Sequence, residues 1–231
     1  MKPVTKLYLL VLLLVFGACQ EQNTTKKVVL VFDRTDSSLS ILNLQTDYVI
    51  NKIISNNQKI FWHGIIVETT SICDSRVTPK HRFQLAYESE YSGNEMGRLV
   101  LIEGISKSLT DEIEKYKRFE HSKPYSFVLE KLNLEIEDYL NDSVPTTIYM
   151  FSDLHQNSPK HSVYKKDQIS QFVIDSILSF DTNTIDLNGL NIHLIHESNQ
   201  ASEDEIFYDM SHKIKSSLER KGAKVFIQAS L

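Results

Sequence analysis

The stretch Lys27-Val28-Val29-Leu30-Val31-Phe32-Asp33 decides the fold, because it is an unbroken apolar and β-branched run that ends in an acid. A strand with apolar residues on both faces is typical of a parallel sheet that helices cover on both sides. The run is therefore predicted to be a central strand of such a sheet, with Asp33 at the edge where its carboxyl end lies.

Strand-like and helix-like segments alternate along the rest of the chain. Further strands are predicted over 60–69, 83–88, 146–153, 190–196 and 223–228, with 83–88 as an antiparallel edge strand, and loops over 73–81 and 90–97. Helices are predicted over 35–56, 109–119, 125–140, 166–180 and 202–221. The alternation predicts a doubly wound α/β fold, with a mostly parallel six-stranded sheet, helices on both faces and right-handed crossovers.

The N-terminus has the pattern of an export signal. Lys2 and Lys6 are followed by the apolar run 7–16, which is shorter than the roughly 20 residues that span a bilayer. Phe16-Gly17-Ala18-Cys19 resembles the lipobox of bacterial lipoproteins, with Phe where Leu is usual. The resemblance implies cleavage before Cys19 and lipid on that cysteine. An ordinary secretory signal with a chance cysteine is the alternative.

The predicted organisation is a signal peptide over 1–18, a lipidated polar tether over 19–27 and one domain over 28–231. With Cys19 lipidated, Cys73 has no partner for an intramolecular disulfide. Gln20 stands where Asp would signal inner-membrane retention, which favours the outer membrane of the cell envelope. No Lys/Arg stripe interleaved with aromatic residues is present, so nucleic acid is not a predicted partner.

Polar residues follow two of the predicted parallel strands. Asp33-Arg34-Thr35-Asp36-Ser37 follows the first strand, and Ser152-Asp153-Leu154-His155 follows the strand predicted over 146–153. Ligands of open parallel sheets bind beyond the carboxyl ends of the strands. Carboxylate and hydroxyl oxygens suit a hard divalent cation. The sequence therefore predicts a cation site at this edge.

Three segments resemble the von Willebrand factor A family and its metal-ion-dependent adhesion site. Residues 28–37 resemble its apolar strand plus D-x-[ST]-x-S, 126–132 resemble its segment in which one Thr precedes a helix, and 148–153 resemble the strand that ends in its third, acidic element. The resemblance implies that Mg²⁺, or Mn²⁺ or Ca²⁺, is held directly or through water by Asp33, Thr35, Ser37, Ser126 and Asp153.

The chain departs from that pattern in places. Ser126 stands where Thr is usual, Lys131 where a small residue is usual, and Leu154 where Gly is usual. Ser122 is an alternative to Ser126. Instead of binding metal, Asp33 and Asp153 could merely cap the helices that follow their strands.

The predicted function is a binding module, not an enzyme, in which the cation accepts an acidic group from an unidentified protein of the cell envelope. A phosphatase resembling the haloacid dehalogenase family is one alternative, because its strands also end in Asp and in Ser, as at Ser152. That family has Asp where Thr35 stands. A metal-free interaction scaffold is the other alternative. The cation model predicts that Asp33→Ala abolishes metal binding and leaves the fold intact.

Overall fold

The computed structural model describes residues 25–35, 45–53, 61–73, 77–117, 125–142, 144–164, 169–178, 185–196 and 201–229. Predictions about Cys19, Ser37 and Ser122 lie outside these residues, as does the predicted signal peptide. Within the described ranges, no helix is both long enough and apolar enough to cross a membrane.

The six strands form one sheet in the order β3-β2-β1-β4-β5-β6. They are β1 Thr25–Asp33, β2 Gly64–Ile72, β3 His81–Leu85, β4 Thr146–Phe151, β5 Leu190–Ile195 and β6 Lys224–Gln228. All neighbours pair in parallel except β3, which pairs antiparallel with β2 at the edge. The predicted doubly wound α/β fold is confirmed, and β1 is central.

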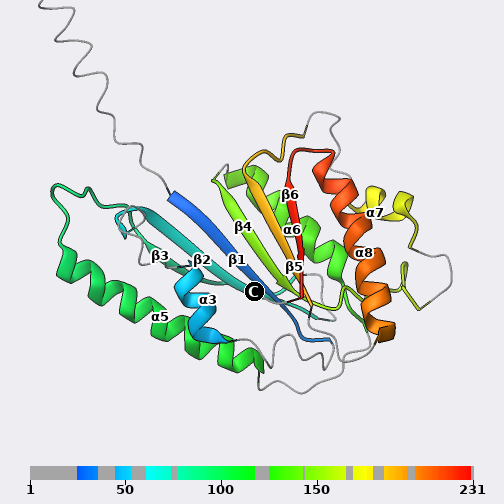
Figure 1. The fold of residues 1–231 in the computed structure, drawn as a ribbon, viewed down its shortest axis with the longest axis horizontal. Helices are drawn as coiled ribbons and strands as arrows, with labels where there is room; N and C mark the ends of the chain where they lie inside the picture. The colour runs from blue at the N-terminus through cyan, green and yellow to red at the C-terminus, as the bar shows by residue number, and fades with distance from the viewer. Residues whose placement is uncertain are drawn as a thin grey trace, which may run out of the picture.

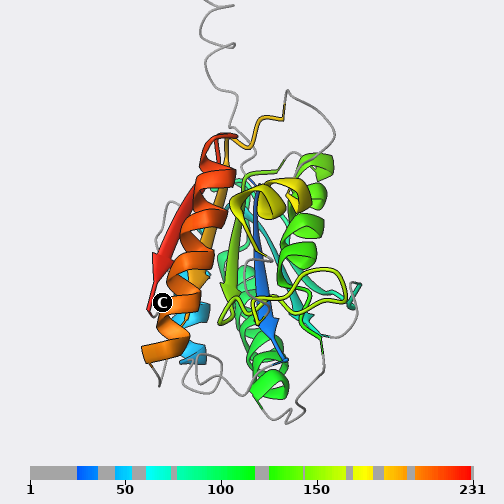
Figure 2. The ribbon, with the colours of Figure 1, turned by 90° about the vertical axis from the view of Figure 1, so that its right-hand side faces the viewer.

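Helices cover both faces of the sheet (Figure 1, Figure 2). They are α3 Thr46–Ile53, α5 Glu95–Lys117, α6 Val128–Asp142, α7 Gln171–Ile177 and α8 Ala201–Glu219. The side chains of β1 alternate between two cores, with Val29 and Val31 packed under α6 to α8, and Leu30 and Phe32 packed under α3 and α5. This alternation explains why the whole β1 run is apolar.

Several predicted boundaries were wrong. Thr25–Lys27 belong to β1 instead of the tether, because Lys27 is held by Glu68 and Asp142. Residues 61–63 precede β2. The predicted loop 90–97 contains the first turn of α5, since the Asn94 side chain accepts a hydrogen bond from the Gly97 N–H and caps that helix.

Other boundaries differ near the predicted site. Thr35 lies in a bend after β1 and not in a helix, because its N–H and hydroxyl both bond to the Asp33 carboxylate. The strand predicted to reach Asp153 ends at Phe151. The helix predicted over 166–180 spans only seven residues and begins after the N-cap Ser170.

Arg98 fixes the start of α5 to the end of the sheet where β1 and β2 begin. Its guanidinium donates to the carbonyls of Phe61, His63 at 2.5 Å and Ala86 at 2.8 Å. The side chain is 1 % exposed, and its guanidinium lies over the Phe61 and Trp62 rings in cation–π contacts. The N-terminal quarter of α5 therefore lies beside the start of β2.

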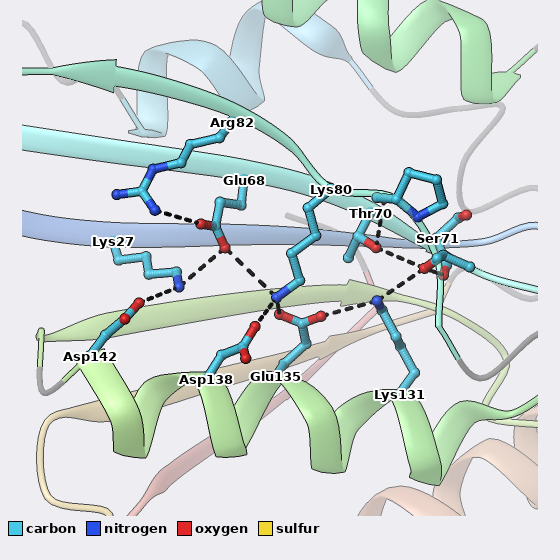
Figure 3. A network of polar contacts seen from close by, with 12 residues as sticks. Lys27, Glu68, Thr70, Ser71, Lys80, Arg82, Lys131, Glu135, Asp138 and Asp142 are labelled. Carbon is cyan, nitrogen blue, oxygen red and sulfur yellow. Dashed lines mark hydrogen bonds and ion pairs between the residues drawn. The ribbon is translucent and has the colours of Figure 1, made fainter.

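A buried network of charges joins α6 to β1, β2 and the start of β3 (Figure 3). Glu135 receives Lys80 at 2.7 Å and Lys131 at 3.1 Å, while Lys27 bridges Glu68 at 3.1 Å and Asp142 at 2.8 Å. Burial lowers the pKa of Lys131 although Glu135 opposes that shift. Lys131 is thus one member of a paired cluster.

A half-buried titratable group, His193, lies on the opposite sheet face. The His193 ring stacks between Tyr149 and Phe226, with 4.6 Å between ring centroids on each side. Burial lowers the pKa of His193 below its ordinary 6.5, against the hydrogen bond that its Nδ1–H donates to the Gln228 side-chain oxygen. The unfolded chain therefore takes up a proton at this position more readily than the folded chain does.

The free energy of unfolding should accordingly fall as the pH drops below about 6.5, by at most about 1.4 kcal/mol per pH unit for this group. His193→Phe keeps the ring stack and should flatten that slope, measured by urea denaturation from pH 7.5 to 5. His212→Asn, on the exposed face of α8, is the matched control, and its slope is compared with that of His193→Phe. An identical slope in His193→Phe and the parent chain would contradict the assignment.

Candidate functional site

Asp33 is the link between the carboxyl ends of β1 and β4. It is the last residue of β1 and is 1 % exposed. Its Oδ1 accepts hydrogen bonds from the Thr35 N–H at 2.9 Å and the Thr35 hydroxyl at 2.6 Å, and its Oδ2 accepts from the Ser152 hydroxyl at 2.6 Å. The structure therefore brings two of the predicted ligands together and adds Ser152 to them.

The loop after β4 places Asp153 at the same edge. The Ser152 hydroxyl accepts the Leu154 N–H at 2.9 Å, and Asp153 Oδ1 accepts the His155 N–H at 2.9 Å. His155 Nδ1 lies 3.3 Å from Asp153 Oδ2. Asp153 is 2 % exposed, so its carboxylate is held by the loop and not by bulk water.

Leu154 has a left-handed backbone conformation, which glycine adopts most readily. Its φ is +59°, in the left-handed region, which costs a side-chain-bearing residue about 1–2 kcal/mol. The side chain is fully buried in the core under α6 to α8, and burying a leucine contributes about 1.5–3 kcal/mol. The apolar burial thus offsets the strain, and the sharp turn is kept without a glycine.

Ser126 is joined to this loop through the backbone. Its N–H and carbonyl form a two-way bridge with Asn157, each bond 2.8 Å long, just before α6 begins. The Gln156 side chain is buried and accepts the Leu129 N–H at 2.9 Å, which caps the start of α6. The segments that carry Ser126 and Asp153 therefore form one unit.

The Ser126 hydroxyl is buried, with the residue 4 % exposed, and no hydrogen-bond partner for it is found in the described part of the chain. Buried hydroxyls are almost always satisfied, because leaving one without a partner costs about 1–3 kcal/mol. An unsatisfied oxygen at this edge is a candidate ligand position.

The donors at this edge are of one chemical kind. Among the residues for which a structure is described, Asp33, Thr35, Ser126 and Asp153 offer carboxylate or hydroxyl oxygens, and Ser37 lies outside them. No group of three or more His, Cys, Asp or Glu side chains suited to a metal occurs in those ranges. A closed cage of acids or imidazoles is therefore not formed there, whereas an oxygen set with two carboxylates suits Mg²⁺ with water completing its shell.

The geometry bears on the phosphatase alternative as well. A nucleophilic aspartate must meet its substrate, but the Asp33 carboxylate accepts three hydrogen bonds from described residues and is 1 % exposed. Ser152, the residue that suggested the alternative, donates one of those bonds. The arrangement fixes the Asp33 side chain in place instead of presenting it for attack.

Ser152 and Gln156 were not predicted as parts of the cation site, although Ser152 was part of the phosphatase alternative. Ser152 precedes a predicted ligand directly, and this adjacency was the available signal. The sequence contains no signal for Gln156. Its side chain caps α6 only because that helix begins beside the loop after β4. Pairing between distant segments is not readable from local pattern.

No protein-family model matches the chain, and no curated protein matches it. Similar solved structures include the human COPII-coat protein Sec24c, at 9 % identity and a TM-score of 0.48, over 92 % of this chain and 31 % of that one. Proximal thread matrix protein 1 from the mussel byssus matches at 12 % identity and 0.38, over 87 % and 49 %. The conserved hypothetical protein BatB from Bacteroides thetaiotaomicron matches at 8 % identity and 0.35, over 90 % of each chain. This chain thus spans about a third of the Sec24c length and half of the byssus protein's, and the roles of its residues rest on its own geometry.

Proposed function

We propose that the chain is a lipid-anchored binding module of the cell envelope, with the outer membrane favoured, that engages a protein partner through a divalent cation. The residues that would hold Mg²⁺, Mn²⁺ or Ca²⁺ are Asp33, Thr35, Ser37, Ser126 and Asp153. The cation, only partly coordinated by the chain, accepts an acidic group from the partner. No nucleophile or general base is needed for this function.

The observation that carries the proposal is the buried, unsatisfied hydroxyl of Ser126 at the edge where Asp33 and Asp153 lie. The two carboxylates, of Asp33 and Asp153, can balance the charge of one divalent cation. Hydroxyl oxygens complete a hard donor set. A cation accounts both for the burial of these acids and for the serine oxygen that lacks a partner within the described residues.

Ser126→Ala gives the sharpest test, because it should weaken metal binding without lowering the stability of the metal-free protein. Removing an unsatisfied buried hydroxyl leaves the free energy of unfolding unchanged or higher, while the loss of a ligand should weaken Mg²⁺ binding at least about tenfold. Calorimetric titration with Mg²⁺, Mn²⁺ and Ca²⁺, beside urea denaturation of the metal-free protein, measures both. Asp153→Asn should also weaken binding, and Asp175→Asn on α7 is the control that should not.

Asp33→Ala is a poorer test than the sequence suggested. It leaves Ser152 and Thr35 without their shared acceptor, so a loss of about 1–3 kcal/mol is expected, and Asp33→Asn is the better variant. Unchanged Mg²⁺ affinity in folded Ser126→Ala and Asp153→Asn would contradict the cation site and favour the metal-free scaffold.

A further inference from the structure

The first turns of α5 are apolar on the side that faces away from the sheet. Met96 is 72 % exposed, Leu99 44 % and Val100 66 %, while Ile102 and Ile105 on the other side pack onto the sheet core. A surface helix ordinarily carries polar residues opposite its core side. We call Met96, Leu99 and Val100 the α5 apolar face.

Gly104 continues the line of Met96 and Val100 at intervals of four residues. A Cβ built on it would meet no atom within 4 Å, so nothing in the described chain requires a glycine there. Glycine weakens a helix interior, and one of its uses is to let another body approach the backbone closely. The apolar line and the glycine together indicate a surface that something covers.

The α5 apolar face lies at the edge of the sheet where β1 begins. Arg98, in the same turns of α5, binds the carbonyls of Phe61 and His63, and Gly64 directly after them pairs with Thr25. Figure 1 shows the start of β1 and the start of α5 on the same side of the molecule. Asp33 is eight residue steps further along β1, or about 26 Å away at 3.3 Å per step.

The predicted lipid anchor is close to that edge in sequence. Only six steps separate Cys19 from Thr25, and an extended chain covers at most about 3.6 Å per residue, or about 22 Å. A lipid on Cys19 would therefore keep the start of β1, and with it the α5 apolar face, near the bilayer surface. This step rests on the lipid anchor of the proposed function.

We propose that the α5 apolar face docks on the surface of the bilayer beside the lipid anchor, which turns the Asp33 edge of the sheet away from the membrane and toward a partner. Apolar side chains at this face leave water for the membrane interface, as exposed interfacial helices do. Glu95 and Glu103 are exposed on the same turns, so a zwitterionic surface suits the face better than a strongly anionic one.

The test uses the full lipidated chain, made in a bacterial host and reconstituted in phosphatidylcholine vesicles. Cys73→Ser leaves a single introduced thiol for an environment-sensitive fluorophore, at Val100→Cys or at the control Tyr208→Cys. Tyr208 is 65 % exposed on α8, which follows the carboxyl end of β5. The label at 100 should be quenched at least about threefold more by lipid-borne quenchers than the label at 208, and Met96→Glu should reduce that ratio.

Vesicle flotation tests the lipid anchor separately from the docking of the α5 apolar face. Protein that floats with vesicles but shows equal quenching at both labels would overturn the docking and leave the anchor intact. Protein that does not float would overturn the anchor and the docking with it. A label at 100 that is shielded from water but not reached by the lipid quencher would mean that a second copy or another protein covers the face, which also overturns the docking.

Discussion

Replacing Arg98 with methionine is expected to lower the free energy of unfolding by about 3–5 kcal/mol. The guanidinium is buried and is the donor for the carbonyls of Phe61, His63 and Ala86, and Glu88 lies 3.5 Å from it. Methionine fills similar space but donates no hydrogen bond, so three buried acceptors lose their partner at once. An unsatisfied buried acceptor costs about 1–3 kcal/mol.

Urea denaturation of the parent chain and the variant measures the loss. Arg220→Met is the matched control, because Arg220 forms a two-oxygen ion pair with Asp175 but its side chain is 60 % exposed, and such surface pairs contribute about 0–1 kcal/mol. The loss of stability in Arg98→Lys should lie between those of Arg98→Met and Arg220→Met, since lysine keeps the charge but lacks the several N–H donors of the guanidinium. Equal losses at positions 98 and 220 would contradict the anchoring role of Arg98.

The sheet could be predicted because its signal is local. An apolar run over β1 and a matching run over β4 are what strands need when both faces are covered, and Pro145 marks where β4 begins. The same reasoning located β3 as an antiparallel edge strand. Each of these inferences uses only residues inside the element itself.

The start of α5 could not be predicted in this way. Gly93 and Gly97 suggested a loop, and the apolar residues that follow lack one-sided periodicity, since Met96 and Val100 face outward. The helix is held by the Asn94 cap and by Arg98, whose partners come from residues before β2 and after β3. A contact between segments so far apart in the chain leaves no pattern in the sequence.

The candidate site could be predicted only in part: the acids at the strand ends could be located, but the contacts between segments could not. Asp33 and Asp153 stand at strand ends, and topology alone brings such ends to one edge. The bond from Ser152 to Asp33 and the bridge from Ser126 to Asn157 lie on either side of a left-handed turn at Leu154, a residue that rarely adopts that conformation. Their geometry required the structure, and the occupancy of the site by a cation stays a prediction.

A second large effect is expected in the buried network between α6 and the sheet (Figure 3). Glu135 is 1 % exposed and receives both Lys80 and Lys131. Glu135→Leu should lower the free energy of unfolding by about 3–5 kcal/mol, because Lys131, only 2 % exposed, keeps its charge and loses its acid. Within the described residues, the hydrogen bond that its ammonium then keeps goes to the Thr78 hydroxyl at 3.0 Å.

The double variant Lys131→Met with Glu135→Leu separates pairing from packing. It removes both charges and keeps the volume, so it should recover most of the loss, since buried pairs replaced by apolar residues are often neutral. The single variant should also regain stability from pH 7 to pH 9. Burial already lowers the pKa of Lys131, and without Glu135 the folded chain releases that proton more readily than the unfolded chain. If the double variant were as unstable as Glu135→Leu at both pH values, lost packing and not an unpaired charge would explain the effect, and the network would not be what fixes α6 on the sheet.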